Sequence, residues 1–107
     1  MKDKPQLISN AFQLFMSEAP DFAQAWGSMV QDLAEASALD EKTKDLAYLA
    51  VLASLNRLSG IPFHVASLKA KGASREEVIS AVLVGLPAAG HVVTQALPSA
   101  IEAFDAE

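Results

Sequence analysis

The chain has 107 residues, of which 51% are hydrophobic, and a formal net charge of −5 at pH 7. This length suffices for one compact core and is too short for two independent ones, so we expect a single domain over residues 1–107. The basic residues are scattered among a larger number of acidic ones, which disfavours nucleic acid and anionic membrane surfaces as partners. No cysteine is present, so disulfides, thiolate metal ligands and thiol nucleophiles are excluded.

Alanine, leucine and valine dominate the composition while aromatic residues are few, which favours an all-α fold. The N-terminus has charge but no apolar core like that of a secretory signal. No apolar run approaches the roughly 20 residues needed to span a bilayer. We therefore expect a cytoplasmic protein.

Two amphipathic helices are predicted near the N-terminus. The first begins at Pro5 and runs to about Ala19, where Pro20 interrupts the pattern. The second follows Pro20 with apolar residues at helical spacing, which predicts one narrow buried stripe. The stripe comprises Phe22, Ala25, Trp26, Met29, Val30 and Leu33.

The stretch from Asp40 to Gly72 organises the rest of the chain. Asp40 is a good N-cap for the amide of Lys42 or Thr43. Residues 46–55 are apolar nearly all the way round, which is typical of a central or interface helix. A break over residues 56–60 precedes a new helix with Pro62 in its first turn, and Gly72 is expected just past its end.

The C-terminal part is predicted to contain two more helical segments, for about six in all. Ser74 and Glu77 have the spacing of a capping box at the start of the first. Pro87 and Gly90 interrupt the chain, and Pro98 should kink or split the last segment. The tail over residues 105–107 is expected to fray.

The start of the helix at Pro62 is a candidate anion site. The amides of Gly60, Ile61 and Phe63 should lack intrahelical partners, and the guanidinium of Arg57 would complete a carboxylate clamp. In the alternative interpretation, Arg57 instead caps the carbonyl groups at the end of the preceding helix. Both interpretations remain open on the sequence alone.

His64 lies on the inner face of its helix, with Ile61, Val65 and Leu68. A buried imidazole needs a hydrogen-bond partner, for which Asp45 and Tyr48 are candidates. If Asp45 orients His64, the pair has the arrangement of general acid and base catalysis. A structural role in packing is the alternative.

No metal site is expected, because no spaced set of histidines and carboxylates occurs. His91 follows Gly90 near a helix start with no second ligand close by, and we interpret it as structural or exposed. Nothing in the sequence indicates a cofactor.

Two stretches, ALDEKTKDLAYLAVLASLN and IPFHVASLKAKGASREEVISAVLVGLPAAGHVV, resemble the carboxymuconolactone decarboxylase and alkylhydroperoxidase D-like (AhpD-like) family. The resemblance implies an all-α domain that assembles into homotrimers or homohexamers through its helices. In the peroxidase branch, a Cys-x-x-Cys-x-x-x-His motif lies here, with a glutamate on the preceding helix as proton relay. The thiol positions fall at Arg57 and Gly60 and the relay acid at Asp45. Because both cysteines are absent, dithiol peroxidase chemistry is not expected.

The decarboxylase branch is similar in carrying an arginine at the position of Arg57 together with the histidine, and its substrates are small carboxylate-bearing lactones. It has an acid where Gly60 stands here. The resemblance thus implies lyase-type or decarboxylase-type chemistry on a small anionic molecule. The expected catalytic residues are His64 and Asp45, and the expected substrate-binding residues are Arg57, Gly60 and Tyr48.

Two other functions stay open. One is a non-catalytic oligomeric scaffold or ligand sensor in which His64 is a packing residue. The other is peroxide reduction by a route without cysteine, related to the peroxiredoxin-type activity of the thiol-containing branch.

Overall fold

The computed structural model describes residues 8–106, and every regular element within them is helical. The predicted all-α class is confirmed. The α-helices and the two 3₁₀ segments (η1 and η2) follow one another as α1 Asn10–Glu18, α2 Pro20–Ala36, α3 Glu41–Ser54, η1 Leu58–Gly60, α4 Ile61–Ala70, α5 Arg75–Leu83, α6 Leu86–Ala89, η2 His91–Ala96 and α7 Leu97–Asp105.

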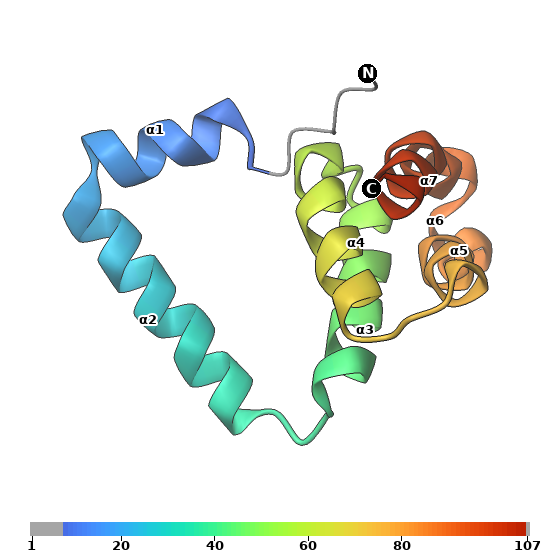
Figure 1. Ribbon diagram of the computed structural model, residues 1–107, viewed down its shortest axis with the longest axis horizontal. Helices are drawn as coiled ribbons and strands as arrows, with labels where there is room; N and C mark the ends of the chain where they lie inside the picture. The colour runs from blue at the N-terminus through green and yellow to red at the C-terminus, as the bar shows by residue number, and fades with distance from the viewer. Residues whose placement is uncertain (1–7, 107) are drawn as a thin grey trace.

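The core is formed by α3, α4, α5 and α7 (Figure 1). Helix α4 packs on α3 and α7, and α5 packs on the same two helices, so the four surround one apolar interior. Alanines 53, 96, 100 and 103 are buried between larger side chains and let the helices approach closely. The largest fully buried side chains are Leu49, Ile61, Val65, Leu68, Val78, Val82 and Val93.

Both predicted N-caps are confirmed. The Asp40 carboxylate accepts the amide of Thr43 at 2.7 Å at the start of α3. At the start of α5, the Ser74 hydroxyl accepts the Glu77 amide at 3.0 Å, and the Glu77 carboxylate accepts the Ser74 amide at 2.9 Å. Each bond satisfies a backbone donor that has no partner within its helix.

Helices α3 and α4 end in the same kind of turn. After α4, the amide of Gly72 donates to Lys69 and that of Ala73 to Leu68, at 3.1 and 3.0 Å, and Gly72 has φ +88° as expected for a residue just past a helix end. After α3, Asn56 takes the corresponding left-handed position with φ 57°. Asparagine tolerates this region better than other residues with a Cβ atom.

Pro98 was predicted to kink or split the last helical segment, and the segment is split. It consists of η2, which ends at Ala96, and α7, which begins at Leu97. Gly90 has φ +82° and separates α6 from η2, while Pro98 lies in the first turn of α7. The expectation of fraying from residue 105 is wrong for Asp105, which ends α7 and accepts two bonds from Arg75 at 3.0 and 3.2 Å. Lys69 also donates to the carbonyl groups of Phe104 and Ala106, which holds this end on α4.

Helices α1 and α2 meet at a wide angle and together stand off from the core (Figure 1); we call them the arm (residues 10–36). They pack on each other through Trp26, whose ring centroid lies 5.3 Å from that of Phe12 and 6.4 Å from that of Phe15. The start of the predicted first helix at Pro5 lies outside the described residues. The Cα radius of gyration is 14.3 Å, against about 13 Å for a compact domain of this length.

The buried stripe predicted for the second helix is wrong. No residue of α2 is buried, and Phe22 is 74% exposed. The apolar spacing exists, but no helix of the described core covers it, because α2 has substantial contact with α1 alone.

The left-handed turn at Asn56 provides a test of the fold. Replacing Asn56 by alanine should lower the free energy of unfolding by about 1 kcal/mol, because a Cβ atom without a compensating polar group is strained at this φ. Asn56→Gly should cost nothing or stabilise slightly. Urea unfolding at one fixed protein concentration measures both, with Gly72→Ala as the matched variant expected to lose stability. An unchanged Asn56→Ala variant would contradict this account of the turn.

Candidate functional site

His64 lies in the first turns of α4 and faces α3. Its ring centroid is 4.8 Å from that of Tyr48 on α3 and 5.3 Å from that of Phe63. The ring is therefore held between aromatic groups of two helices. The interpretation that His64 faces inward is supported only in part, because the residue is half-buried whereas Ile61, Val65 and Leu68 are fully buried.

The nitrogen atoms of the His64 ring make no hydrogen bond within the described residues. In the same part of the chain, no buried side-chain nitrogen or oxygen lacks a partner. The two ring nitrogens must therefore have contact with solvent. Both are available to a ligand in a single copy of the chain.

Asp45 is the buried charged residue of the described core, at 9% exposure, and its partner is Lys71 and not His64. The Lys71 ammonium donates to Asp45 Oδ2 and, at 3.1 Å, to Glu41 Oε2. Glu41 and Asp45 are one turn apart on α3, and Lys71 is the C-cap of α4. This ionic cluster ties the start of α3 to the end of α4.

The charges of this cluster act on His64 without touching it. Partial burial lowers the pKa of His64 below its ordinary value, the negative charge of Asp45 raises it, and the positive charge of Lys71 lowers it again. Burial is the largest of these effects, so His64 is neutral at pH 7. The hydrogen bond to Asp45 in turn raises the pKa of Lys71 and keeps this side chain charged.

The expected anion site at the start of α4 is only partly formed. The amides of Gly60 and Ile61 are not free, because η1 directs them to the carbonyl groups of Arg57 and Leu58. A 3₁₀ turn leading into a helix satisfies donors that an isolated helix start would leave open. Anion recognition by these two amides is therefore a prediction that the structure does not support.

Arg57 is exposed, and its side chain makes no ion pair or hydrogen bond with the described residues. The other basic side chains of residues 8–106 all bind carboxylates or carbonyl groups. The alternative in which the Arg57 side chain caps α3 is not observed either, since the backbone amide of Arg57 makes the bond to Leu52, at 2.8 Å. The guanidinium is thus left available.

Gly60 ends η1 beside His64. A Cβ atom built at Gly60 would lie 3.9 Å from His64 Cδ2 and 3.4 Å from a methyl group of Leu52. A side chain at this position would therefore start against the imidazole. Its absence leaves that edge of the ring open.

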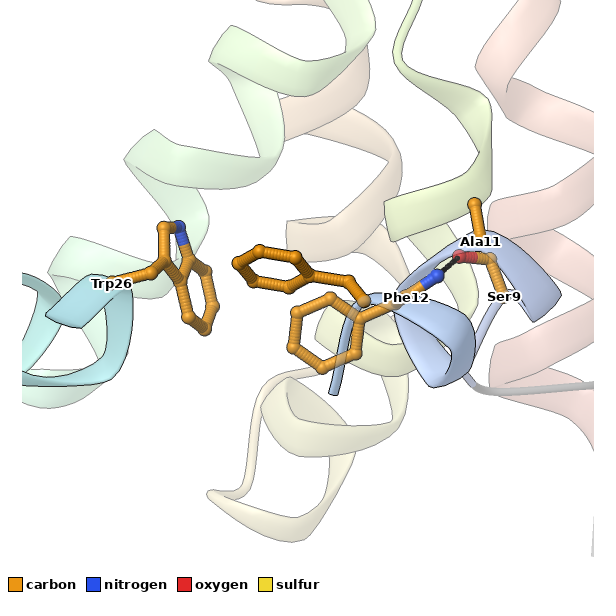
Figure 2. Close-up of a pocket in the computed structure, with 5 residues that line it drawn as sticks. Ser9, Ala11, Phe12 and Trp26 are labelled. Atoms are coloured by element: carbon orange, nitrogen blue, oxygen red, sulfur yellow. Dashed lines mark hydrogen bonds between the residues drawn. The ribbon is translucent and has the colours of Figure 1, made fainter. Parts of the chain in front are cut away.

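Two shallow hollows lie on the described part of the chain, and neither of these is lined by Arg57 or His64. The first, of about 370 Å³, lies within the arm (Figure 2) and is lined by Ser9, Ala11, Phe12, Phe15 and Trp26. The second, of about 640 Å³, lies between α3 and α5. The sequence-based hypothesis of a pocket between α3 and α4 corresponds to neither of them.

The described residues contain no group of three or more histidine, aspartate or glutamate side chains placed to hold a metal ion. Within the same range, no helix has both the length and the apolar character that crossing a membrane requires.

Comparisons with known proteins agree with this fold. The family model "Carboxymuconolactone decarboxylase family" matches residues 20–103. The structure is similar to the crystal structure of apo-lpg0406, a carboxymuconolactone decarboxylase family protein from Legionella pneumophila, with a TM-score of 0.75 and 27% sequence identity over 89% of this chain and 85% of that one. The search of curated proteins gives no match.

The fold is therefore an all-α domain of the AhpD-like type. With a family match over most of its length, the chain belongs to the carboxymuconolactone decarboxylase family.

Two members of the site were missed from the sequence, Lys71 and Glu41. Lys71 lies 26 residues from Asp45 and meets it because α3 and α4 pack side by side. Glu41 could have been suspected, because it stands one turn before Asp45 on the same helix. No local pattern indicates Lys71, which resembles an ordinary basic residue at a helix C-terminus.

The effect of Lys71 on His64 can be measured directly. Replacing Lys71 by methionine should raise the pKa of His64, because the variant removes a positive charge that lowers it and leaves the negative charge of Asp45 in place. NMR titration of the imidazole protons reports this pKa. Lys44→Met is the matched control, since Lys44 pairs with Glu41 at 3.8 Å and has no bond to Asp45. A pKa that falls in Lys71→Met would refute the electrostatic coupling.

Proposed function

We propose that this protein binds a small carboxylate-bearing molecule beside His64 and exchanges a proton with it, in the manner of lyase-type or decarboxylase-type acid and base chemistry. The observation that carries the proposal is the state of His64. Its ring is fixed by Tyr48 and Phe63, and its nitrogens are unbonded and open to solvent. Membership of the carboxymuconolactone decarboxylase family supports the same reaction class.

Each residue has a distinct role in this proposal. Neutral His64 accepts the proton and returns it, for which a pKa near or below neutrality is suited. Tyr48 and Phe63 provide apolar walls for the ligand. Arg57 holds the carboxylate, because it is an unpaired guanidinium that begins the turn ending at Gly60.

Asp45 acts through charge and not as a direct orienter of the imidazole. Its carboxylate accepts a bond from Lys71, and no hydrogen bond joins it to a ring nitrogen of His64 in the observed arrangement. The charges of the ionic cluster therefore adjust the proton affinity of His64, on which burial has the larger effect. Asp45 therefore remains part of the proposed site, but it acts through its charge, whereas we expected from the sequence that it would orient His64 by a hydrogen bond.

The rival function is a non-catalytic oligomeric scaffold or ligand sensor with His64 as a packing residue. A packing histidine is normally enclosed and hydrogen-bonded. The open nitrogens of His64 favour the acid and base function over this rival.

Self-association is part of the proposal, with a homotrimer or homohexamer as the expected assembly. The support is the number of large apolar side chains left exposed in one copy, including Phe22, Leu33, Leu55 and Val84. Large apolar side chains gathered at a surface are typical of sites that bind another protein.

The proposed chemistry predicts a specific pattern among variants. Small lactone acids should bind to the wild-type protein, and Arg57→Ala should weaken binding about tenfold or more, because a charge-assisted contact is lost. Exchange of the ligand's acidic carbon-bound protons with solvent deuterium, followed by NMR, should stop in His64→Ala. Arg75→Ala is the matched arginine control, since Arg75 is already paired with Asp105. Equal binding and exchange in wild type, Arg57→Ala and His64→Ala would end the proposal.

The rate of this exchange should also depend on pH in one direction. Because the pKa of His64 lies below its ordinary value, the basic form is present at neutral pH and is lost as the pH falls through that lowered pKa. Exchange should therefore be constant near neutrality and decrease on acidification. The midpoint should move upward in Lys71→Met, as the imidazole pKa does.

Peroxide reduction should be absent. The chain has no cysteine, so a dithiol donor has no thiol or disulfide to turn over. A peroxide consumption assay with a dithiol as reductant should give the rate of the reagents alone. Turnover above that rate that disappears in His64→Ala would establish a cysteine-free peroxidase and refute this expectation.

A further inference from the structure

Apart from the contact of Trp26 with α1, the apolar face of α2 has no substantial contact in its own chain. On α2, Phe22, Trp26, Met29 and Leu33 recur at helical spacing and all are exposed, Leu33 at 62%. Polar residues occupy the opposite side of the same helix, among them Gln31. An amphipathic helix is stabilised in water mainly by burying its apolar face. The arm therefore needs a surface to cover.

The core presents a second unpartnered apolar surface, on the side of α3 that faces away from the interior. Val51 is 50% exposed and Leu55 is 61% exposed there. Beside them lies the hollow of about 640 Å³ between α3 and α5, lined in part by Ala47, Ala50 and Val84. We call this surface the outer face of α3 (Ala47, Ala50, Val51, Leu55 and Val84).

We propose that the arm of one copy packs along the outer face of α3 in a second copy. The inference rests on the self-association proposed above and specifies which surfaces meet. The two surfaces match in length, since α2 has 17 residues and α3 has 14, or roughly 25 and 21 Å at 1.5 Å per residue. The arm offers bulky side chains, and the lining of the hollow includes three small ones, Ala47, Ala50 and Ala81, which leave room for them.

The charges of the two parts differ in kind. The charged residues of the arm are all acidic: Glu18, Asp21, Asp32 and Glu35. Among the described residues, every basic side chain belongs to the core, which also carries acidic ones. Because Glu76 and Glu77 belong to the lining of the hollow, the proposed contact is mainly an apolar one.

The exposed area is sufficient for a stable interface. The accessible surface is 7067 Å², whereas a compact monomer of 11.3 kDa has about 5,700 Å². The excess is on the order of 1,300 Å² per chain, and a standard interface requires about 800 Å² from each partner.

A second copy is favoured over closure within one chain by the link between α2 and α3. Ser37 and Asp40 both have extended backbone angles, and the arm diverges from α3 beyond them (Figure 1). In this arrangement the arm has no substantial contact with α3 of its own chain. Closure onto the same chain is the competing outcome in the experiments below.

The absence of cysteine permits a clean crosslinking test. Met29→Cys and Val51→Cys are prepared as separate proteins, mixed in urea, refolded together and treated with a short bismaleimide. The expected product contains one chain of each kind. The matched control pairs Gln31→Cys with Val51→Cys, because Gln31 lies on the polar side of α2. This control pair should give at least fivefold less crosslinked product. Equal yields from both pairs, or a Met29→Cys/Val51→Cys double variant that crosslinks only within one chain, would overturn the proposal.

Sedimentation separates this inference from the self-association on which it rests. Wild-type protein at micromolar concentration should be oligomeric, Leu33→Asp should sediment as a monomer with helical content retained, and Gln31→Asp should behave as wild type. A monomeric wild type would refute self-association and arm exchange together. If wild type and Leu33→Asp form the same oligomer, self-association stands and the arm contact is wrong.

Discussion

The structure depends on which part of the apolar surface of α3 is buried in the core and which part stays exposed. This helix is apolar around most of its circumference, but α4, α5 and η2 cover one side of it, where Leu49 and Ala53 are fully buried. The other side remains open in one copy. That imbalance places a hydrophobic surface between the candidate site and the hollow beside α5.

The candidate site results from a balance between burial and charge. Aromatic neighbours hold the imidazole of His64 in a partly desolvated place, which favours its neutral form. Asp45 alone would oppose this effect, since a nearby anion stabilises imidazolium. Lys71 binds the carboxylate and weakens that opposition. Burial thus lowers the pKa of His64 most, and a lysine from the far end of the same helix adds to this effect.

The sequence was sufficient where the determining contacts are local. Asp40, Gly72 and the pair Ser74 and Glu77 act within one turn, so their spacing predicts their bonds. It was insufficient where contacts are distant, as for Lys71 and Asp45. The sequence also does not show which surface covers the apolar side of α2. The pattern of α2 predicts which side is apolar, but the same pattern serves a helix buried in its own chain and one that is left exposed.

The short link after α2 has a consequence for the site. Asp40 is both the end of the link and the N-cap of α3, and the next residue, Glu41, binds Lys71. The first turn of α3 is thus both the point where the arm joins the core and a second point of attachment for Lys71. The lysine whose charge lowers the pKa of His64 is held by Glu41 at the residue directly after the link, as well as by Asp45 one turn further on.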